Sequence, residues 1–314
     1  MPYPILVMLE KNIPYSPYFG NFEKRAQELV GLLHYKKLKI AFVECSVGGF
    51  LSYNIVKRKG ASKIFIGSIV PYSYDMKNYF DFNSPKGAVS EEFVDVCAEK
   101  FISISGADVV VCESSILGPD GGTPQKPVGL SFVSVRSKKG KTSFVNVFRG
   151  DRKRIMENIA AFCFSAAKNH IIGWDLETKE VSSTFVYYNG RILVMKRSRK
   201  VGTYKGMWGV ASGHIEKGET SLQTAFKELE EETSMKKEFI KEMIQGSPFE
   251  FVDPKIRIRW VIHPFLAISA ISPVEFVKID WEHTSFKLIR PSELNKLRTA
   301  PMIYEGYLKT VFRG

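Results

Sequence analysis

Cysteine is scarce in this 314-residue sequence, and the few cysteines lie far apart along the chain. They are Cys45, Cys97, Cys112 and Cys163. No two of them form the C-x-x-C pair typical of zinc and redox sites, so their spacing predicts neither a zinc site nor a disulfide framework. Long apolar runs are also missing, because residues 5–9 are too few for a signal peptide or a membrane span. We therefore expect a reduced, cytoplasmic protein that does not enter a membrane.

Acidic residues are too few to balance the basic ones. The chain has 45 lysines and arginines against 33 aspartates and glutamates, a net charge of +12. Such a charge favours anionic partners, which include nucleotides, phosphates and RNA. The basic residues gather in short clusters, which are typical of solvated faces. These clusters are Lys36-Lys37, Lys57-Arg58-Lys59, Lys138-Lys139-Lys141 and Arg197-Ser198-Arg199-Lys200.

Strand-like and helix-like segments alternate over the first half of the chain, which predicts a layered α/β domain. The expected strands cover residues 39–44, 63–70, 107–112, 130–136 and 142–148, and the expected helices cover residues 21–37, a run opening at Ser90, and 152–167. The chain changes unit around residues 172–178, so we predict domains over 1–172 and 173–314. In the second domain Asn189-Gly190 separates two strand-like runs and predicts a hairpin.

Residues 213–235, GHIEKGETSLQTAFKELEEETSM, carry the clearest chemical pattern. Thr220 and Gln223 have the spacing of a capping box at a helix start. An apolar stripe of Leu222, Ala225, Phe226 and Leu229 follows at helical spacing. Glu228, Glu231 and Glu232 share another face, where like charges repel unless a cation lies between them. Hard divalent cations prefer such oxygen ligands, although a solvated acidic face is the alternative.

This stretch resembles the Nudix box, G-x5-E-x7-R-E-U-x-E-E-x-G-U, in which U is a bulky aliphatic residue. The matching residues are Gly213, Glu219, Glu228, Leu229, Glu231, Glu232 and Met235. Lys227 replaces the arginine and Ser234 replaces the late glycine. The lead-in over residues 206–214 is also similar to the family's G-x-W-x-x-P-G-G-H. Lysine keeps the charge of arginine but loses its forked geometry.

The resemblance implies an α/β/α Nudix sandwich with a mixed sheet, which hydrolyses a nucleoside diphosphate linked to another group. It implies Mg²⁺ or Mn²⁺ as the cofactor, with the metal-binding residues Glu228, Glu231 and Glu232. The resemblance also implies catalytic roles for Glu231 and Glu282. Glu282 lies where many Nudix enzymes have a further acidic residue.

The first domain offers Cys45, which lies at the end of an expected strand and before a helical run. A helix start lowers the pKa of a nearby thiol, so Cys45 is a candidate nucleophile, with a buried structural cysteine as the alternative. The order of its motifs resembles the C-terminal domain of the CinA family, the nicotinamide-mononucleotide amidases. The motifs are ECSVGG at 44–49, YS at 72–73, GAVSEE at 87–92, GP at 118–119, GGTP at 121–124, KPVG at 126–129 and GDR at 150–152.

That resemblance implies a three-layer α/β/α domain in which Cys45 replaces the serine nucleophile and Lys77 is the matching base. It also implies that the nucleotide contacts Tyr72, Gly121, Gly122, Thr123 and Arg152. Val47 and Ser115 replace residues of the family pattern near the reacting group. These changes favour a nucleotide-binding domain of altered activity.

Together the two resemblances predict a metal-dependent Nudix hydrolase acting on ADP-ribose or a pyridine dinucleotide, joined to an amidase-like domain. CinA proteins commonly pair the amidase domain with an ADP-ribose pyrophosphatase, which supports this substrate class. The alternatives are an RNA-directed, decapping-type Nudix enzyme, which the basic charge favours, and a non-catalytic pyridine-nucleotide sensor. We expect a small-molecule nucleotide substrate and a homo-oligomeric protein. The group linked to the diphosphate and the pathway do not follow from the sequence.

Overall fold

The computed structural model describes residues 13–16, 20–275 and 277–312. These residues divide into two compact units, one of residues 16–176 and one of residues 177–312 together with 13–15. The apolar run at residues 5–9 lies outside the described residues. Within the described ranges, no helix is both long enough and apolar enough to cross a membrane.

The first unit is built on a five-stranded mixed sheet with the strand order β2-β1-β3-β4-β5. The inner strand β1 pairs in parallel with both β2 and β3, whereas β3, β4 and β5 pair antiparallel. The strands are β1 (Ile40–Glu44), β2 (Phe65–Ile69), β3 (Val109–Ser115), β4 (Leu130–Ser137) and β5 (Gly140–Val147). Every residue of β1 is buried, as expected for a parallel strand covered on both faces.

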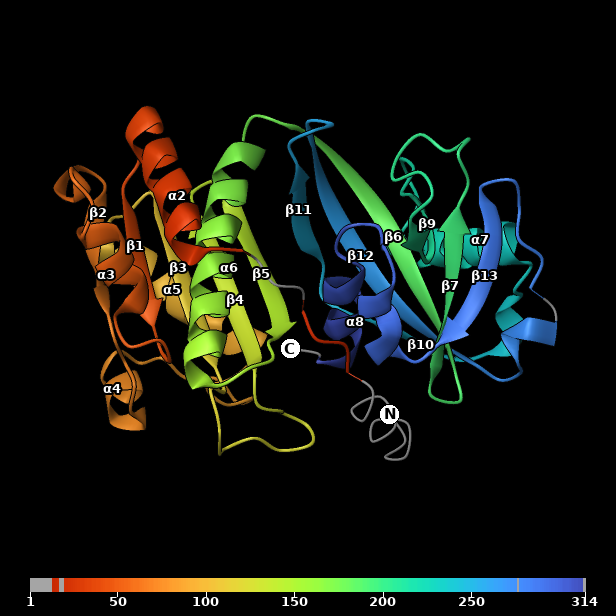
Figure 1. The fold of residues 1–314 in the computed structure, drawn as a ribbon, viewed down its shortest axis with the longest axis horizontal. Coiled ribbons are helices and arrows are strands. Elements are labelled where there is room, and N and C mark those ends of the chain that lie inside the picture. Colours follow the sequence, from red (N-terminus) through yellow and green to blue (C-terminus); the bar gives the residue numbers. More distant parts are fainter. Residues whose placement is uncertain (1–12, 17–19, 276, 313–314) are drawn as a thin grey trace. The chain divides into compact units, whose positions relative to one another are not determined.

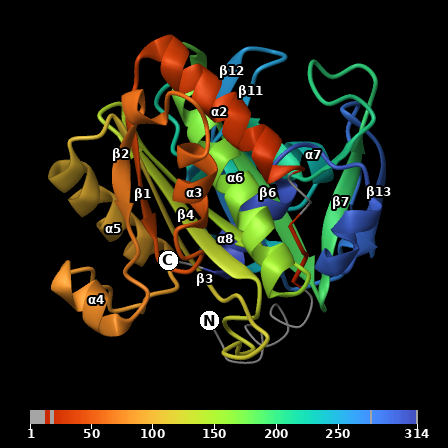
Figure 2. The same ribbon diagram turned by 60° about the vertical axis from the view of Figure 1, so that its left-hand side comes forward.

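Helices cover both faces of this sheet and form the three layers predicted from the sequence. Figures 1 and 2 show α2 and α6 on one face and α5 on the other. The helices are α2 (Phe22–Lys36), α3 (Phe50–Val56), α4 (Tyr74–Tyr79), α5 (Glu91–Ser105) and α6 (Arg152–Gly173), with a 3-10 turn η1 (Ala61–Lys63). The predicted cap at Ser90 is confirmed, because its side chain accepts from the Phe93 N–H. Helix α6 continues to Gly173 rather than ending near residue 167.

The second unit is built on an eight-stranded mixed sheet with the main strand path β10-β12-β6-β7-β13. Its long central strands β6 and β12 are parallel, and the other pairs are antiparallel. The strands are β6 (Glu177–Tyr188), β7 (Arg191–Arg197), β8 (Trp208–Gly209), β9 (Ala211–His214), β10 (Ile240–Gln245), β11 (Phe249–Asp253), β12 (Ile258–Ser269) and β13 (His283–Ile289). Asn189 and Gly190 form the predicted hairpin turn, both with positive φ.

Two helices enclose the second sheet, as Figure 1 shows, with α7 on one face and α8 on the other. They are α7 (Ser221–Thr233) and α8 (Ile303–Val311), accompanied by 3-10 turns η2 (Lys237–Phe239), η3 (Pro273–Glu275) and η4 (Pro291–Lys296). Successive residues of β6 face opposite helices, because Val186 shares a core cluster with Leu229 of α7, whereas Phe185 stacks edge-on against Tyr307 of α8 at 5.6 Å. This alternation gives the predicted α/β/α sandwich.

Candidate functional site

The three glutamates of α7 that are predicted to bind metal have different environments, although they share one helix. Glu232 is 4% exposed, and its Oε1 accepts from the Ser212 N–H of β9 at 3.2 Å. Its Oε2 accepts no hydrogen bond from any described residue. Glu228 is half-buried and lies directly against the α-carbon of Gly213, whereas Glu231 is exposed. The capping box that starts this helix at Thr220 is present as predicted.

Burial and mutual repulsion destabilise the ionised forms of the buried carboxyl groups. Burial raises the pKa of Glu228, and the charge of Glu231 raises it further. Burial raises the pKa of Glu232 well above its usual range, and the single hydrogen bond from Ser212 offsets only part of this. The neighbouring charges of Glu228, Glu282 and Asp280 also raise the pKa of Glu232. A cation bound beside these carboxyl groups would oppose each of these shifts.

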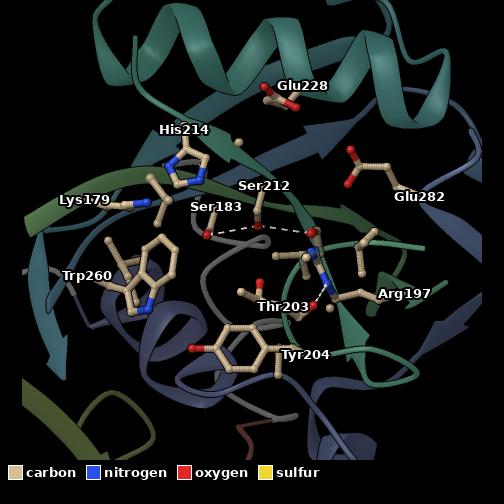
Figure 3. Close-up of a pocket in the computed structure, with 18 of the residues that line it drawn as sticks. Lys179, Ser183, Arg197, Thr203, Tyr204, Ser212, His214, Glu228, Trp260 and Glu282 are labelled. Atoms are coloured by element: carbon tan, nitrogen blue, oxygen red, sulfur yellow. Dashed lines mark hydrogen bonds between the residues drawn. The ribbon is translucent and has the colours of Figure 1, made fainter. Parts of the chain in front are cut away.

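A cleft of about 550 Å³ opens beside this helix in the second unit. Figure 3 shows Glu228 and Glu282 on one side of the cleft, and Trp260 and Tyr204 at the opposite end. Basic side chains between these ends also line it, among them Lys179, Arg197 and Lys200. Glu231 and Glu232 lie outside the cleft lining. One cavity therefore combines acidic, basic and aromatic walls.

The aromatic end of the cleft is rigid. Trp260 of β12 is 8% exposed, and its indole stacks on the His214 ring with 5.6 Å between the ring centroids and an angle of 29°. Tyr204 donates its hydroxyl to Asp253 Oδ2 at 3.0 Å. Burial and this carboxylate raise the pKa of Tyr204, an effect that the Trp260 indole and the charge of Arg197 only partly offset. A neutral phenol beside a fixed indole suits a flat ring with polar edges.

In the first unit, the residues predicted around Cys45 form a connected set. Lys77 is 6% exposed, and its Nζ donates to the Tyr72 carbonyl oxygen at 2.7 Å. Arg152 donates from Nη2 to the Tyr72 hydroxyl at 3.0 Å and from Nη1 to the Gly118 carbonyl oxygen at 2.8 Å. The positive charge of Lys77 acts to lower the pKa of the Cys45 thiol, although other contributions outweigh it. Hydrogen bonds thus join Lys77, Tyr72 and Arg152.

The glycine-rich loop between β3 and β4 contributes differently. Gly121, Gly122 and Thr123 are exposed, and Thr123 forms a turn in which its N–H donates to the Lys126 carbonyl oxygen at 2.9 Å. No hydrogen bond that the structure gives for the described residues joins these three to Cys45 or Lys77. Among the described residues, the hydrogen bonds that the structure gives join this loop to Arg152 only at Gly118, whose carbonyl oxygen accepts from the guanidinium.

Cys45 itself is held in a group of three cysteines. The sulfur atoms of Cys45, Cys97 and Cys112 all lie within 4.8 Å of one another, and all three residues are buried. A hydrogen bond from Cys112 lowers the pKa of Cys45, but the hydrogen bond with Cys97 and burial outweigh it and raise that pKa overall. This direction is opposite to the one expected from a helix start. Hydrogen bonds from both neighbours and the charge of Lys77 instead lower the pKa of Cys97, although burial alone would raise it.

Comparison with known protein families separates the two units. Residues 22–171 match the family model described as the CinA C-terminal domain, and residues 179–309 match the one described as the NUDIX domain. The chain joins a CinA C-terminal domain to a NUDIX domain. The predicted boundary at residues 172 and 173 falls between the two matches. The NUDIX match covers the whole acidic helix and the cleft beside it.

Relatives of the CinA domain are found in proteins of different length. The chain is 38% identical over 161 residues to a CinA-like protein of Thermotoga sp. (strain RQ2), which is half of this chain but only 39% of that protein. Among solved structures, the chain is similar to competence damage-inducible protein A from Klebsiella pneumoniae subsp. pneumoniae MGH 78578 (19% identity, TM-score 0.47, 50% of this chain and 100% of that one). It is also similar to a MutT NUDIX hydrolase from Burkholderia pseudomallei (18% identity, TM-score 0.36, 42% of this chain and 98% of that one).

Sequence reasoning missed much of the NUDIX cleft. Trp260 and Tyr204 belong to no motif, because they come from strand β12 and from the loop after β7, far apart in the chain. Arg197 and Lys200 belong to a basic cluster interpreted as a solvated face, yet both line the cleft. His283 was also missed. Its Nε2 lies 3.7 Å from Glu232 Oε2, behind the acidic helix.

A buried carboxylate of the CinA domain was missed as well. Glu113 is fully buried and accepts from the backbone N–H groups of Ser46 at 2.8 Å and Val47 at 3.1 Å, and from the Ser46 hydroxyl. Burial and the neighbouring Cys45 raise the pKa of Glu113 to about 7. Its hydrogen bonds fix the loop that follows Cys45. Glu113 lies just after the apolar run at residues 109–112, one position beyond the end of the expected strand, so its burial had no clear signal in the sequence.

Proposed function

We propose that the NUDIX domain hydrolyses the diphosphate bond of a nucleoside diphosphate linked to a second group, with ADP-ribose or a pyridine dinucleotide as its substrate. The observation that carries this proposal is the cleft with carboxylates at one end and a fixed indole at the other. A diphosphate bearing a nucleoside has the same division into an anionic and an aromatic part. The amidase-like domain in the same chain supports the pyridine-nucleotide class. The homo-oligomeric state and the cytoplasmic location stay predictions.

The carboxylates of α7 fit a hard divalent cation. Glu228, Glu231 and Glu232 would hold Mg²⁺ or Mn²⁺, since Glu232 Oε2 is buried without a hydrogen bond and Glu228 and Glu231 repel each other. Such an ion, when bound, neutralises the diphosphate charge and orients water for in-line attack. Lys227, which also lines the cleft, is paired with Glu219 at 3.5 Å.

The remaining residues of the cleft would bind and orient the substrate. Lys179 and Arg197 carry positive charge between the two ends of the cleft and would attract phosphate oxygens. Trp260 would stack on the base, which is worth about 1–3 kcal/mol per base. Glu282, on the wall beside Glu228, would accept a proton from the attacking water. The products of ADP-ribose would be AMP and a phosphorylated ribose.

A substrate panel tests the proposal. Purified protein with Mg²⁺ is expected to cleave ADP-ribose, NAD or NADH at the diphosphate, and chromatography should show AMP as a product. Trp260→Ala is expected to raise KM roughly tenfold or more through lost stacking, whereas Trp260→Phe retains most of the affinity. If none of the three is cleaved while capped RNA or a dinucleoside polyphosphate turns over fast, this substrate class is wrong.

For the CinA domain we propose binding of a nicotinamide nucleotide with little or no amide hydrolysis. The linked set Arg152, Tyr72 and Lys77 supports binding, because the guanidinium and the phenol face one another at 3.0 Å. The state of Cys45 supports the loss of chemistry. Cys45 is 5% exposed and its pKa is raised, whereas a nucleophilic cysteine must reach its substrate as a thiolate. If the amide is hydrolysed, Cys45 would attack it and Lys77 would act as the base.

Nicotinamide mononucleotide distinguishes these states. We expect binding by calorimetry without ammonia release. Arg152→Ala is expected to weaken binding by about tenfold or more, since a charged hydrogen bond contributes roughly 1.5–3 kcal/mol. Arg154→Ala is the matched control, because Arg154 lies on the same helix but its side chain pairs with Glu157. Ammonia release that disappears in Cys45→Ala and in Lys77→Ala would show an active amidase and contradict the proposal.

A further inference from the structure

Three cysteines from three separate elements converge in the CinA domain. Cys45 follows β1, Cys97 lies in α5 and Cys112 lies in β3, so the group sits between the sheet and α5. The exposed fractions are 5% for Cys45 and 0% for the other two. Cys163, the fourth cysteine, lies on α6 against the other face of the sheet and is not part of the group.

A buried cation accompanies this group. Lys77 is 6% exposed, and its Nζ donates to one carbonyl oxygen. Within the part of the chain that the structure describes, no carboxylate forms an ion pair with Lys77. Its charge instead acts on Cys45 and Cys97. The ammonium also lies 5.6 Å from the centre of the Tyr74 ring, but neither this ring nor the carbonyl oxygen carries the full negative charge that a thiolate would supply.

We propose that Cys45, Cys97 and Cys112 form a thiolate site for a thiophilic divalent cation of the Zn²⁺ class, with Lys77 as its counter-charge. Zn–S bonds of about 2.3 Å place the sulfurs of a tetrahedral site about 3.8 Å apart. The sulfurs here already lie within 4.8 Å of one another, so side-chain rotations of the three cysteines close the difference. Soft sulfur ligands select this class of ion over Mg²⁺.

The charges at such a site balance. Each thiol that binds the cation releases its proton to water, and three thiolates around a divalent ion carry one net negative charge. The single positive charge of Lys77 neutralises that remainder within the buried site. Metal binding would also occupy the Cys45 sulfur, so the same site would withdraw this thiol from amide chemistry. The carboxylates of the acidic helix are hard oxygen ligands that suit Mg²⁺, so excess Mg²⁺ in the test would occupy that site and limit its uptake of the thiophilic ion.

The test uses the full chain, freed of metal under reducing conditions. It is incubated with Zn²⁺ or Cd²⁺ in the presence of excess Mg²⁺ and dialysed, and its metal content is then measured. We expect about one bound ion per chain and an ultraviolet charge-transfer band with Cd²⁺. The band reports sulfur ligation directly in the unaltered protein, without relying on a variant that must fold.

Variants assign the ligands. Cys97→Ser and Cys112→Ser are each expected to lower the affinity by at least about a hundredfold, because each removes one metal–sulfur bond. Cys163→Ser, a buried cysteine outside the group, is the control that should retain the ion. Cys97→Ala repeats the test without a new hydroxyl, and circular dichroism checks folding. Equal metal content in all variants, absence of the Cd²⁺ band in the unaltered protein, or a disulfide within the group in place of a bound ion would each overturn the proposal.

Discussion

Glu231→Gln and Glu232→Gln are each expected to lower diphosphate turnover by at least about a hundredfold, because metal coordination contributes several kcal/mol to this reaction class and each tenfold loss corresponds to about 1.4 kcal/mol. Glutamine keeps the size of the side chain but cannot provide the negative charge. Steady-state rates at saturating Mg²⁺ measure the effect. Glu230→Gln is the matched control, because Glu230 is exposed on the same helix and directly precedes Glu231.

Stability measurements separate a lost ligand from a damaged fold. Burial raises the pKa of Glu232 above its ordinary value of 4.5, so the folded, metal-free protein holds this proton more tightly than the unfolded chain does. Its free energy of unfolding should therefore fall as pH rises from 4.5 through the raised pKa. Glu232→Gln should remove that decline while leaving a folded protein. Full activity in both glutamine variants would refute the assignment of the metal ligands.

The acidic helix was predictable because its signals are local. The capping pair Thr220 and Gln223 lies within one turn, and the apolar stripe and the three carboxylates follow from helical periodicity alone. The hairpin at Asn189 was equally local, since two residues with positive φ fix the turn. The α/β/α layers followed from the alternation of elements, because apolar strands and amphipathic helices leave few other ways to bury their apolar faces.

The rest of the two sites depends on contacts between distant segments. Trp260 and Tyr204 meet only because β12 and the loop after β7 reach the same cleft. The cysteines were interpreted as separate because Cys45 and Cys112 are far apart in sequence. Cys112 nevertheless pairs with Val43, two residues before Cys45, on the adjacent parallel strand. The exposure of individual side chains was also not predictable. Glu231 and Glu232 are adjacent in the sequence, yet Glu231 is exposed and Glu232 is buried. Spacing along the chain carries no information about such pairings.

Gly213→Ala is expected to reduce turnover about as strongly as Glu228→Gln, although it removes no polar or charged side chain. A Cβ at Gly213 would lie 1.9 Å from Glu228 Oε1 and 2.1 Å from its Cδ. Atoms cannot approach so closely, so the flexible glutamate side chain must move away. The backbone of Gly213 does not have the positive φ that disfavours alanine. The domain should therefore fold normally while one of its proposed metal ligands leaves its position.

Gly209→Ala is the matched control for this change. Gly209 lines the same cleft, but a Cβ there would meet only Arg197, at an ordinary contact distance of 3.8 Å. Its turnover should stay within about twofold of the unaltered protein, as is usual for changes that create no strain. A double variant decides the mechanism. If Gly213→Ala acts only by displacing the Glu228 carboxylate, adding Glu228→Gln should cause little further loss, because one carboxylate cannot be lost twice. Losses that multiply would show that the methyl group disturbs the cleft by another route, and the close packing of Gly213 against Glu228 would not be what positions the proposed metal ligand.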